Sequence, residues 1–429
     1  MFVVRVSAVA LLVGGAAMAA SPTPTFYKDV LPVLQDRCQS CHRQGEAGPM
    51  ALLDYKATRP YAKAIKAAVL GRKMPPWPAD PHYGVFENDR RLSDAEVSTI
   101  TAWADGGAPE GNPKDAPKPV AWVEGWTIGN PDVVLPMPQA VDIPATGTIE
   151  YQYLVIPTGF TKDTWVTAAE VRPGNRAVVH HVIAFLRPPG SPWMADAKPG
   201  VPFVPGKEQR GARRQAANGE DLPSELLVGY APGMPADKSP AGAAKLVKAG
   251  SDIVLQLHYT SNGTATKDQT RIGLVLAKET PQFRQVTMNA TQNKFAIPPG
   301  DPNYEVKSEI TLRDDAELVN LMPHMHLRGK DFAYKAVYPT GESSILLSVP
   351  KYDFNWQLVY MFAKPVLLPK GTKIECTAHF DNSANNPANP DPTKVVKWGD
   401  QSWDEMMIGW FDVIIPATKS PMNLYKVGE

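Results

Sequence analysis

Proline is the residue type that most limits the regular elements of this chain. The sequence has 43 prolines among 429 residues, and proline cannot donate the backbone hydrogen bonds of helix interiors and central strands. We therefore expect many short strands and turns rather than long helices. From residue 130 onward, segments rich in β-branched and aromatic residues alternate with turn residues, which favours β-sandwich or jelly-roll domains. The strands expected are residues 151–156, 165–171, 178–186, 253–259, 309–312, 317–322, 332–338, 344–349 and 373–380, with one short helix at 241–248.

The beginning of the chain has the pattern of an export signal. Residues 1–20 combine Arg5, a short apolar core and the small-residue cleavage site Ala17-Met18-Ala19, so we expect a periplasmic or secreted protein. No other segment is apolar enough to span a membrane once the signal is removed. Lysine plus arginine equal aspartate plus glutamate, at 44 each, so the charge balance favours neither nucleic acid nor an anionic surface. The basic stretch 207–214 is interpreted as a solvated loop.

A haem-attachment motif follows the signal. Cys38-Gln39-Ser40-Cys41-His42 has the C-x-x-C-H spacing in which two thioethers fix a c-type haem and the histidine is the proximal ligand. For the sixth iron ligand we favour Met74, which is followed by two prolines and Trp77. Met50 and His82 are the alternatives.

Three helices are expected around this motif. One spans residues 26–37, a second spans 61–69, and a third begins at the capping box of Ser93 and Glu96 and ends at Gly106-Gly107. Together these features resemble a small class-I-like cytochrome c. The expected organisation is therefore an all-α domain at 21–112, followed by a proline-rich linker at 113–129.

Five of the eight histidines lie in three strand-like segments. They are His180, His181, His258, His324 and His326. Side chains two apart on a strand share a face, so the last pair can act together. Adjacent histidines face opposite ways, and a shared metal would require a β-bulge or a turned ring.

A methionine is the sixth candidate ligand. Met406 follows Asp404-Glu405, with Met407 as its competitor. Imidazoles alone do not select a metal, but two imidazoles and one thioether form a soft set that suits Cu(I).

The order of these motifs resembles a known family. His180-His181, then the segment ending in His258, then His324-Met325-His326, then Asp404-Glu405-Met406 are similar to the copper-dependent, ascorbate-using monooxygenases. That family includes peptidylglycine α-hydroxylating and dopamine β-monooxygenases, and the resemblance runs from about residue 130 to the C-terminus. It implies two sandwich domains, at 130–284 and 285–429.

The resemblance also implies roles for these residues. His180, His181 and His258 would hold one copper that stores an electron. His324, His326 and Met406 would hold the copper at which O2 hydroxylates a C–H bond of an organic substrate that the sequence does not name. The haem would relay electrons from a periplasmic donor, either a cytochrome or a small reductant. The alternative is a non-catalytic haem and copper protein that transfers electrons or binds copper.

Several positions depart from the family. Met322, Ile408 and Trp410 stand where the peptide hydroxylases have the arginine, asparagine and tyrosine that hold a peptide carboxylate. This difference indicates a more apolar or differently charged substrate. Cys376 is the one cysteine outside the haem motif, so the disulfides of the eukaryotic enzymes have no counterpart. The oligomeric state is not determined by the sequence.

Overall fold

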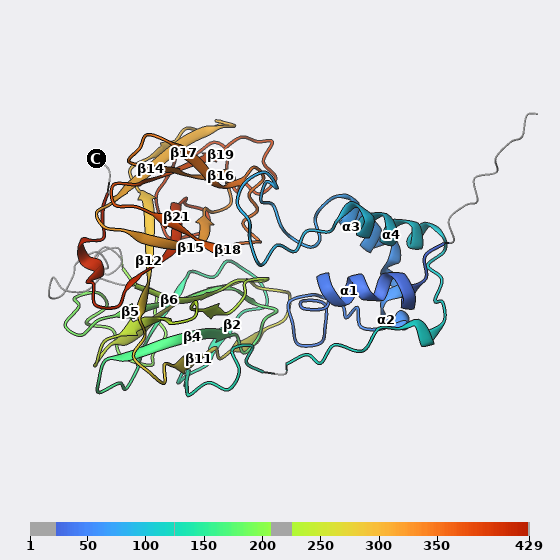
Figure 1. Cartoon of the computed structure of the whole chain (residues 1–429), viewed down its shortest axis with the longest axis horizontal. Helices are drawn as coiled ribbons and strands as arrows, with labels where there is room; N and C mark the ends of the chain where they lie inside the picture. The colour runs from blue at the N-terminus through green and yellow to red at the C-terminus, as the bar shows by residue number, and fades with distance from the viewer. Residues whose placement is uncertain (1–22, 124, 207–224, 428–429) are drawn as a thin grey trace, which may run out of the picture.

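Most of the described chain is β-sheet. The computed structural model describes residues 23–123, 125–206 and 225–427, so the expected signal segment and the basic stretch 207–214 lie outside the described residues. Two β-sandwiches lie one above the other in Figure 1, and a helical region lies beside them. Each predicted strand segment overlaps a strand of the structure. The described residues contain no helix long and apolar enough to cross a membrane.

The first sandwich packs two antiparallel sheets around one apolar core. The strands of one sheet are β1 (Val133–Pro136), β11 (Arg271–Leu276), β4 (Thr164–Arg172), β8 (Ala243–Val247) and β7 (Asp237–Lys238). The strands of the other are β3 (Gln152–Pro157), β9 (Asp252–Tyr259), β5 (Val179–Arg187) and β6 (Glu225–Tyr230). A separate ribbon pairs β2 (Val141–Ile143) with β10 (Thr266–Asp268). Leu255 and Leu274, one from each sheet, are fully buried in the core between them.

The second sandwich has the same two-layer form. Its first sheet contains β12 (Phe283–Gln292), β21 (Met407–Pro416), β15 (Ala316–His324) and β18 (Tyr360–Leu368). Its second sheet contains β17 (Ser343–Val349), β16 (Gly329–Val337), β19 (Lys373–Phe380), β14 (Tyr304–Leu312) and β22 (Tyr425–Val427). A small ribbon of β13 (Ala296–Ile297) and β20 (Val396–Lys397) and the 3₁₀ turn η5 (Pro421–Asn423) complete it. The expected boundary at 284/285 falls inside β12.

One sheet runs through both sandwiches. β8 pairs in parallel with β12, at Ala243 with Phe283 and Ala244 with Arg284, and this joins the two sheets into one of nine strands. The helix expected at 241–248 is therefore wrong. The other side of β8 pairs with β4, so this alanine-rich segment has strand partners on both edges, and tertiary pairing overrides its helix propensity.

A third apolar cluster lies between the two sandwiches. It contains Tyr151, Val254 and Phe185 from the first sandwich, together with Met406 and Trp410 from the second. Nine consecutive residues of β21 are buried, because one of its faces packs on the core of its own sandwich and the other lies in this cluster. The sheet β3-β9-β5-β6 and the sheet containing β15 and β21 thus face each other across an interface that contains this apolar cluster.

The helices gather before residue 120. They are η1 (Phe26–Val30), α1 (Leu31–Arg37), α2 (Tyr55–Thr58), η2 (Arg59–Tyr61), α3 (Ala62–Leu70), α4 (Asp94–Asp105) and η3 (Pro113–Asp115). The predicted capping box begins α4: Glu96 N donates to Ser93 Oγ at 3.2 Å, and Ser93 N donates to the Glu96 carboxylate at 2.6 Å. Phe26, Leu34 and Trp103 are fully buried in a small core of their own. The expected helices at 26–37 and 61–69 are confirmed.

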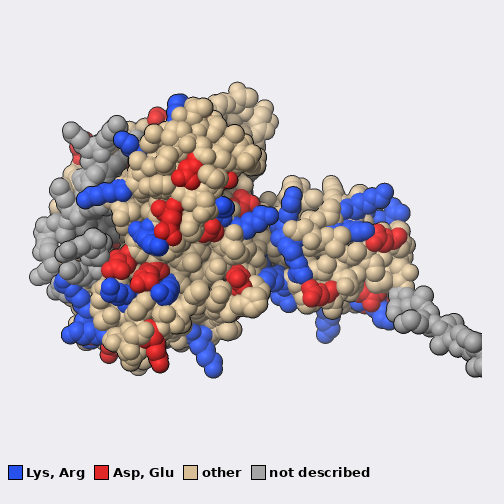
Figure 2. Space-filling model, turned by 90° about the horizontal axis from the view of Figure 1, so that it is seen from above, with Lys and Arg blue, Asp and Glu red and all other residues tan. Residues whose placement is uncertain are grey.

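Charged side chains of both signs are mixed on the surface. On the face shown in Figure 2, lysines and arginines alternate with aspartates and glutamates over both the sandwiches and the helical region.

Lys245 on β8 is a buried cation at the sandwich interface. Its Nζ lies 2.6 Å from Asp237 Oδ2 and 3.7 Å from Asp412 Oδ2, and it also donates to the carbonyl of Leu227 at 2.9 Å. Burial by itself lowers the pKa of Lys245, but the two carboxylates raise it overall. Because Asp412 belongs to β21, this network ties the two sandwiches together.

We predict that Lys245→Met lowers the free energy of unfolding by about 3–5 kcal/mol, because it leaves buried carboxylates without their cation. The matched control is Lys248→Met, which removes the exposed pair with Asp163 and should cost no more than about 1 kcal/mol. Urea denaturation measures both. Equal losses for the two variants would contradict the assignment of Lys245 as the interface cation.

Candidate metal centres

The first histidine cluster is formed by a bulged strand pair. On β5 and β9, Val179 pairs with Tyr259 and His181 pairs with His258, and the register shifts between them, so His180 is the extra residue of a bulge. This is the arrangement that adjacent histidines require in order to face one metal. One ligand atom from each of the three histidines lies within 4.8 Å of the others. His180 Nδ1 and His181 Nδ1 are 3.2 Å apart.

Two nitrogens of this cluster lack partners. His181 Nε2 and His258 Nδ1 are buried, and neither has a hydrogen-bond partner among the described residues. Buried polar atoms are normally satisfied, so these two are candidates for metal ligation. His258 Nε2 lies 3.4 Å from Ser402 Oγ, and Ser402 in turn lies 3.3 Å from Tyr151 Oη. The ring of Tyr151 covers the cluster, with its centroid 4.5 Å from that of His258 and 5.3 Å from that of His181.

The second cluster comes from β15, the turn after it, and the residue that precedes β21. His324 pairs with Ile408 on β21, and the register runs antiparallel. Directly paired residues share a face of the sheet, so His326 and Met406, each two positions further along, continue on that face. Met407 points to the opposite face and is fully buried in the core of the second sandwich. Of the two methionines, Met406 therefore shares the face of the histidines.

Neighbouring groups fix the orientation of the second pair of imidazoles. His324 Nδ1 lies 2.8 Å from Gln357 Oε1, and His326 Nδ1 lies 3.2 Å from the carbonyl oxygen of Asp404. In both cases Nδ1 carries the proton and donates it, so Nε2 keeps the lone pair that a metal needs. Glu405 accepts from the backbone N–H of His326 at 2.9 Å and ties this turn to the beginning of β21. Burial raises the pKa of Glu405 to about 8.

The two clusters converge on the ring of Phe354. His180 stacks on this ring at a centroid distance of 4.8 Å, and His326 meets it edge-on at 5.8 Å. The centroids of His324 and His326 are 5.2 Å apart. The structure therefore brings together all five histidines, with Met406 on the face of the second pair, at the buried interface between the sandwiches.

All five imidazoles are held in the neutral form. Burial lowers the pKa of His180 to about 4, that of His258 to about 3 and that of His324 to about 4. Burial also lowers the pKa values of His181 and His326 well below the ordinary value of 6.5. Neutral imidazole is the form that binds metals.

The cysteine motif lies in a tight turn after α1. The backbone N–H groups of Cys41 and His42 both donate to the carbonyl of Cys38, at 3.1 and 2.9 Å. Cys38 and Cys41 are free thiols. His42 Nδ1 lies 3.2 Å from the carbonyl oxygen of Met50, which leaves His42 Nε2 with a lone pair.

The three candidates for the sixth haem ligand differ in their surroundings. Met74 lines a hollow of about 710 Å³, together with residues of α1, α3 and the beginning of α4. His82 is exposed and lies beside Asp80, and Met50 packs against the small core of the helical region. Of the three, Met74 is the one that lines this hollow.

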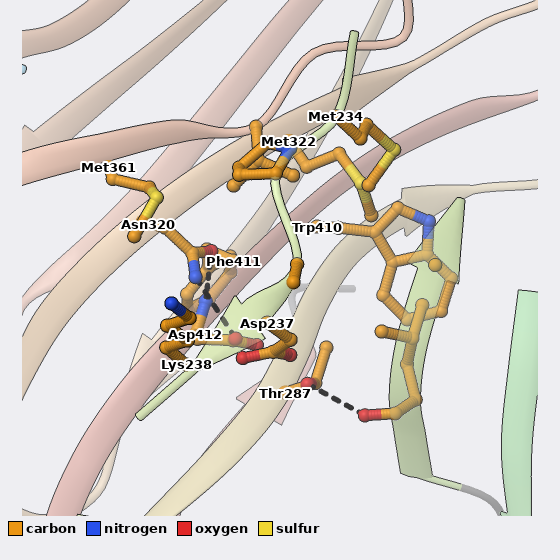
Figure 3. Close-up of a pocket in the computed structure, with 15 residues that line it drawn as sticks. Met234, Asp237, Lys238, Thr287, Asn320, Met322, Met361, Trp410, Phe411 and Asp412 are labelled. Carbon is orange, nitrogen blue, oxygen red and sulfur yellow. Dashed lines mark hydrogen bonds between the residues drawn. The ribbon is translucent and has the colours of Figure 1, made fainter. Parts of the chain in front are cut away.

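A small cavity lies beside the second cluster. It has a volume of about 50 Å³, and Figure 3 shows Met234, Met322, Met361 and Trp410 around its upper part. Met322 pairs with Trp410 across β15 and β21, two residues along the strands from His324, or about 7 Å. Two of the three positions that depart from the resembled family, Met322 and Trp410, therefore line this cavity, whereas Ile408 pairs with His324 instead. Asp412 lies at its lower end and accepts from Asn320 at 3.0 Å.

Four residues of these centres were missing from the sequence interpretation. They are Tyr151, Phe354, Gln357 and Ser402. Each reaches the histidines from a distant part of the chain, and none belongs to a motif. The alternation of the expected strand at 151–156 could have placed Tyr151 on one face, but not against a histidine.

Comparisons with known proteins name no relative. No family model matches the chain, and no curated protein matches it. The solved structures that it resembles include the infectious bursal disease virus Gt strain, at 9% identity and a TM-score of 0.19, covering 68% of this chain and 73% of that one. The VP2 subviral particle of the same virus matches at 11% identity and 0.19, covering 69% and 74%. These TM-scores are too low for the likeness to carry an argument.

The lowered imidazole pKa values predict how stability depends on pH. Between pH 6.5 and about 4, the histidines of the unfolded chain become protonated, whereas those of the folded clusters stay neutral because their pKa values are lowered to about 4. The free energy of unfolding of the metal-free protein should therefore fall as the pH drops through this range. Urea denaturation at a series of pH values measures this slope. His258→Gln should make this slope smaller, because it removes one of the buried imidazoles. The control His82→Gln removes an exposed histidine and should leave the slope unchanged. Equal slopes in the wild type and both variants would contradict the prediction.

Proposed function

We propose that this protein is an exported copper-dependent monooxygenase that hydroxylates a C–H bond with O2 and receives its electrons through a c-type haem. The observation that carries the proposal is the meeting of five neutral imidazoles at the interface of two facing sheets, where His180, His258 and His326 lie against the ring of Phe354. Burying this donor set lowers the stability of the folded state, because two of its nitrogens have no hydrogen-bond partner among the described residues. A bound metal would satisfy both nitrogens. The order of motifs that resembles the copper- and ascorbate-dependent monooxygenases adds to it.

The donor sets fit copper. His180, His181 and His258 offer three nitrogens and no carboxylate or thiolate, while His324 and His326 share a sheet face with the thioether of Met406. A thioether favours Cu(I) over zinc. Copper at these positions would supply one-electron redox chemistry and O2 activation.

The residues around the second set would hold it in one geometry. Gln357 and the Asp404 carbonyl fix the ring orientations of His324 and His326 through their Nδ1 protons. Glu405 holds the backbone of His326 beside Met406, the residue that precedes β21. Because these partners are buried, water has little access to the reacting centre.

The cavity beside this set indicates the class of substrate. Three thioethers and the ring of Trp410 surround its upper part, and the described residues that line it include no arginine. A carboxylate would find no bidentate partner there. We infer that a small apolar group of the substrate enters this cavity, so that a neighbouring C–H bond faces the second set.

The helical region fits a c-type haem. Cys38 and Cys41 are free to form thioethers, and His42 keeps Nε2 for the iron. The hollow lined by Met74 is also lined by Trp77, whose buried Nε1 has no hydrogen-bond partner among the described residues.

We predict that Met406→Ile abolishes O2-dependent hydroxylation in protein loaded with haem and copper, because it removes the thioether from the face of His324 and His326. Met407→Leu is the matched control. It keeps the volume of a core residue on the opposite face, so it should cost less than about 1.5 kcal/mol in stability and retain turnover. Product analysis under O2, over a panel of small apolar substrates, measures both. Turnover by Met406→Ile would show that the catalytic assignment is wrong.

We also predict two coppers and one covalent haem per chain. Metal analysis with copper electron paramagnetic resonance (EPR) should show two Cu(II) environments, and His258→Ala should remove one of them. Cys38→Ala with Cys41→Ala should remove the covalent haem and leave both coppers. Two coppers and a haem without any hydroxylation would instead identify an electron carrier, and haem without copper would contradict the proposal altogether.

A further inference from the structure

Part of the helical region is paired with the second sandwich. Between α3 and α4, residues 77–91 run along the outer edge of β18; we call them the bracing segment. In Figure 1 this is the blue loop that reaches from α3 to the second sandwich. Glu87 N donates to the carbonyl of Met361, and Ala363 N donates to the carbonyl of Val85, both at 2.9 Å. The bracing segment therefore pairs with an edge strand as an added strand would.

Two aromatic rings anchor the bracing segment. The ring centroids of Trp77 and Phe86 lie 4.9 and 5.5 Å from that of Tyr360, the first residue of β18. All three rings are buried in the core of the second sandwich. The polar side chains of the segment are thereby held at fixed positions against the two sandwiches.

Asn88 of the bracing segment holds one wall of the small cavity beside the second histidine cluster. Its Nδ2 donates to the carbonyl of Val359 at 2.8 Å, and its Oδ1 accepts from Met361 N at 3.0 Å. Val359 and Met361 both line the cavity, and Met361 pairs on its other side with Asn320 of β15. One side chain of the helical region thus fixes the backbone of two cavity residues.

Arg90 holds a second wall, which belongs to the first sandwich. Its Nη2 donates to the carbonyl of Gly233 at 3.0 Å. Gly233 has a φ of +82°, which favours glycine, and it lies in a turn that Met234 N closes by donating to the carbonyl of Ala231 at 3.0 Å. Met234 lines the cavity. The hydrogen bond from Arg90 therefore fixes the turn from which this methionine projects.

The bracing segment thus connects cavity methionines of different sandwiches. In Figure 3, Met322 lies between Met361 on one side and Met234 on the other. Methionine side chains have three rotatable bonds and adapt to irregular gaps, so a wall of thioethers does not fix the size of a cavity by itself. The size depends on how firmly the backbone of each methionine is held.

The present size of the cavity restricts what can enter it. An apolar cavity of ~150 Å³ binds benzene or xenon, whereas this one measures about 50 Å³. We therefore expect it to take xenon, the smaller of these two probes, and to exclude benzene.

We propose that Asn88 and Arg90 are positioning residues that keep the cavity small and so restrict it to a small apolar group of the substrate. The inference rests on the proposed function, in which this cavity receives that group. Neither residue lines the cavity, and each acts through the backbone of residues that do, or of their neighbour Gly233. The helical region then determines substrate size, a role separate from holding a haem.

The test measures the binding of two apolar probes and requires neither turnover nor copper. The full-length protein, reduced and labelled with ¹³C in its methionine methyl groups, is titrated with xenon and with benzene. NMR follows the methyl signals of Met234, Met322 and Met361, which are assigned from their single Leu variants. In the wild type, xenon should shift these signals and benzene should not.

Two variants should change this selection. Asn88→Ala and Arg90→Met each release one wall, so benzene should bind about tenfold more tightly than to the wild type, or better. Arg90→Lys keeps a donor for the carbonyl of Gly233 and should behave as the wild type does. Glu46→Gln is the matched control. It weakens the ion pair with Arg176, at 2.6 Å, which joins the helical region to the first sandwich away from the cavity, and it should leave benzene excluded.

Hydrogen exchange of the Ala363 amide, which bonds to the bracing segment, reports whether the segment stays in place in each variant. Unchanged exclusion of benzene in Asn88→Ala and Arg90→Met would overturn the proposal. An equal gain of benzene binding in Glu46→Gln would also overturn it, because the effect would then come from general loosening of the helical region.

The outcome also separates this inference from the proposed function. Wild-type protein without xenon shifts at the three methionines would overturn both the inference and the cavity as a site for an apolar group. The expected probe selection without hydroxylation of any substrate would contradict the proposed function and support the positioning role of Asn88 and Arg90.

Discussion

The pairing of β8 with β12 is the contact on which the arrangement of this molecule depends. Two parallel pairs of residues join two sheets into one, and Lys245, held between Asp237 and Asp412, secures the join with buried charge. Because the sheet is continuous, the sandwiches cannot rotate freely about a linker. The strands that carry the two sets of histidines are therefore held at one separation and one angle, although they belong to different sandwiches.

Within that frame, strand register selects the side chains that can bind metal. A shift of one residue on a strand moves every side chain to the other face. The bulge at His180 uses this property to turn two adjacent histidines toward one point. At the start of β21, Met406, the residue before the strand, lies in the cluster between the sandwiches, whereas Met407, the first residue of the strand, lies in a core. A packing methionine and a candidate ligand can therefore be neighbours in sequence.

What the sequence could predict was local. The alternation of apolar residues located the strands, and the capping box of Ser93 and Glu96 located α4. The adjacency of His180 and His181 left two ways to share a metal, a bulge or a turned ring, and the structure has the bulge. The alanine-rich stretch at 241–248 was misread because its structure is set by partners far away in the chain. Phe354 and Gln357 were missed for the same reason. Their neighbours in sequence carry no signal, and their importance comes from histidines on other strands.

The position of residues 77–91, the segment between α3 and α4 that pairs with the edge of β18, limits how this chain can be divided. The segment that covers the edge of β18 lies between two helices of the helical region, well before the expected linker at 113–129. A cut at that linker would thus remove a strand-like neighbour and two aromatic rings from the second sandwich. The remaining piece would present an open β-edge beside exposed apolar surface, the combination that promotes aggregation. The two parts are better regarded as one cooperative unit than as modules that could be exchanged.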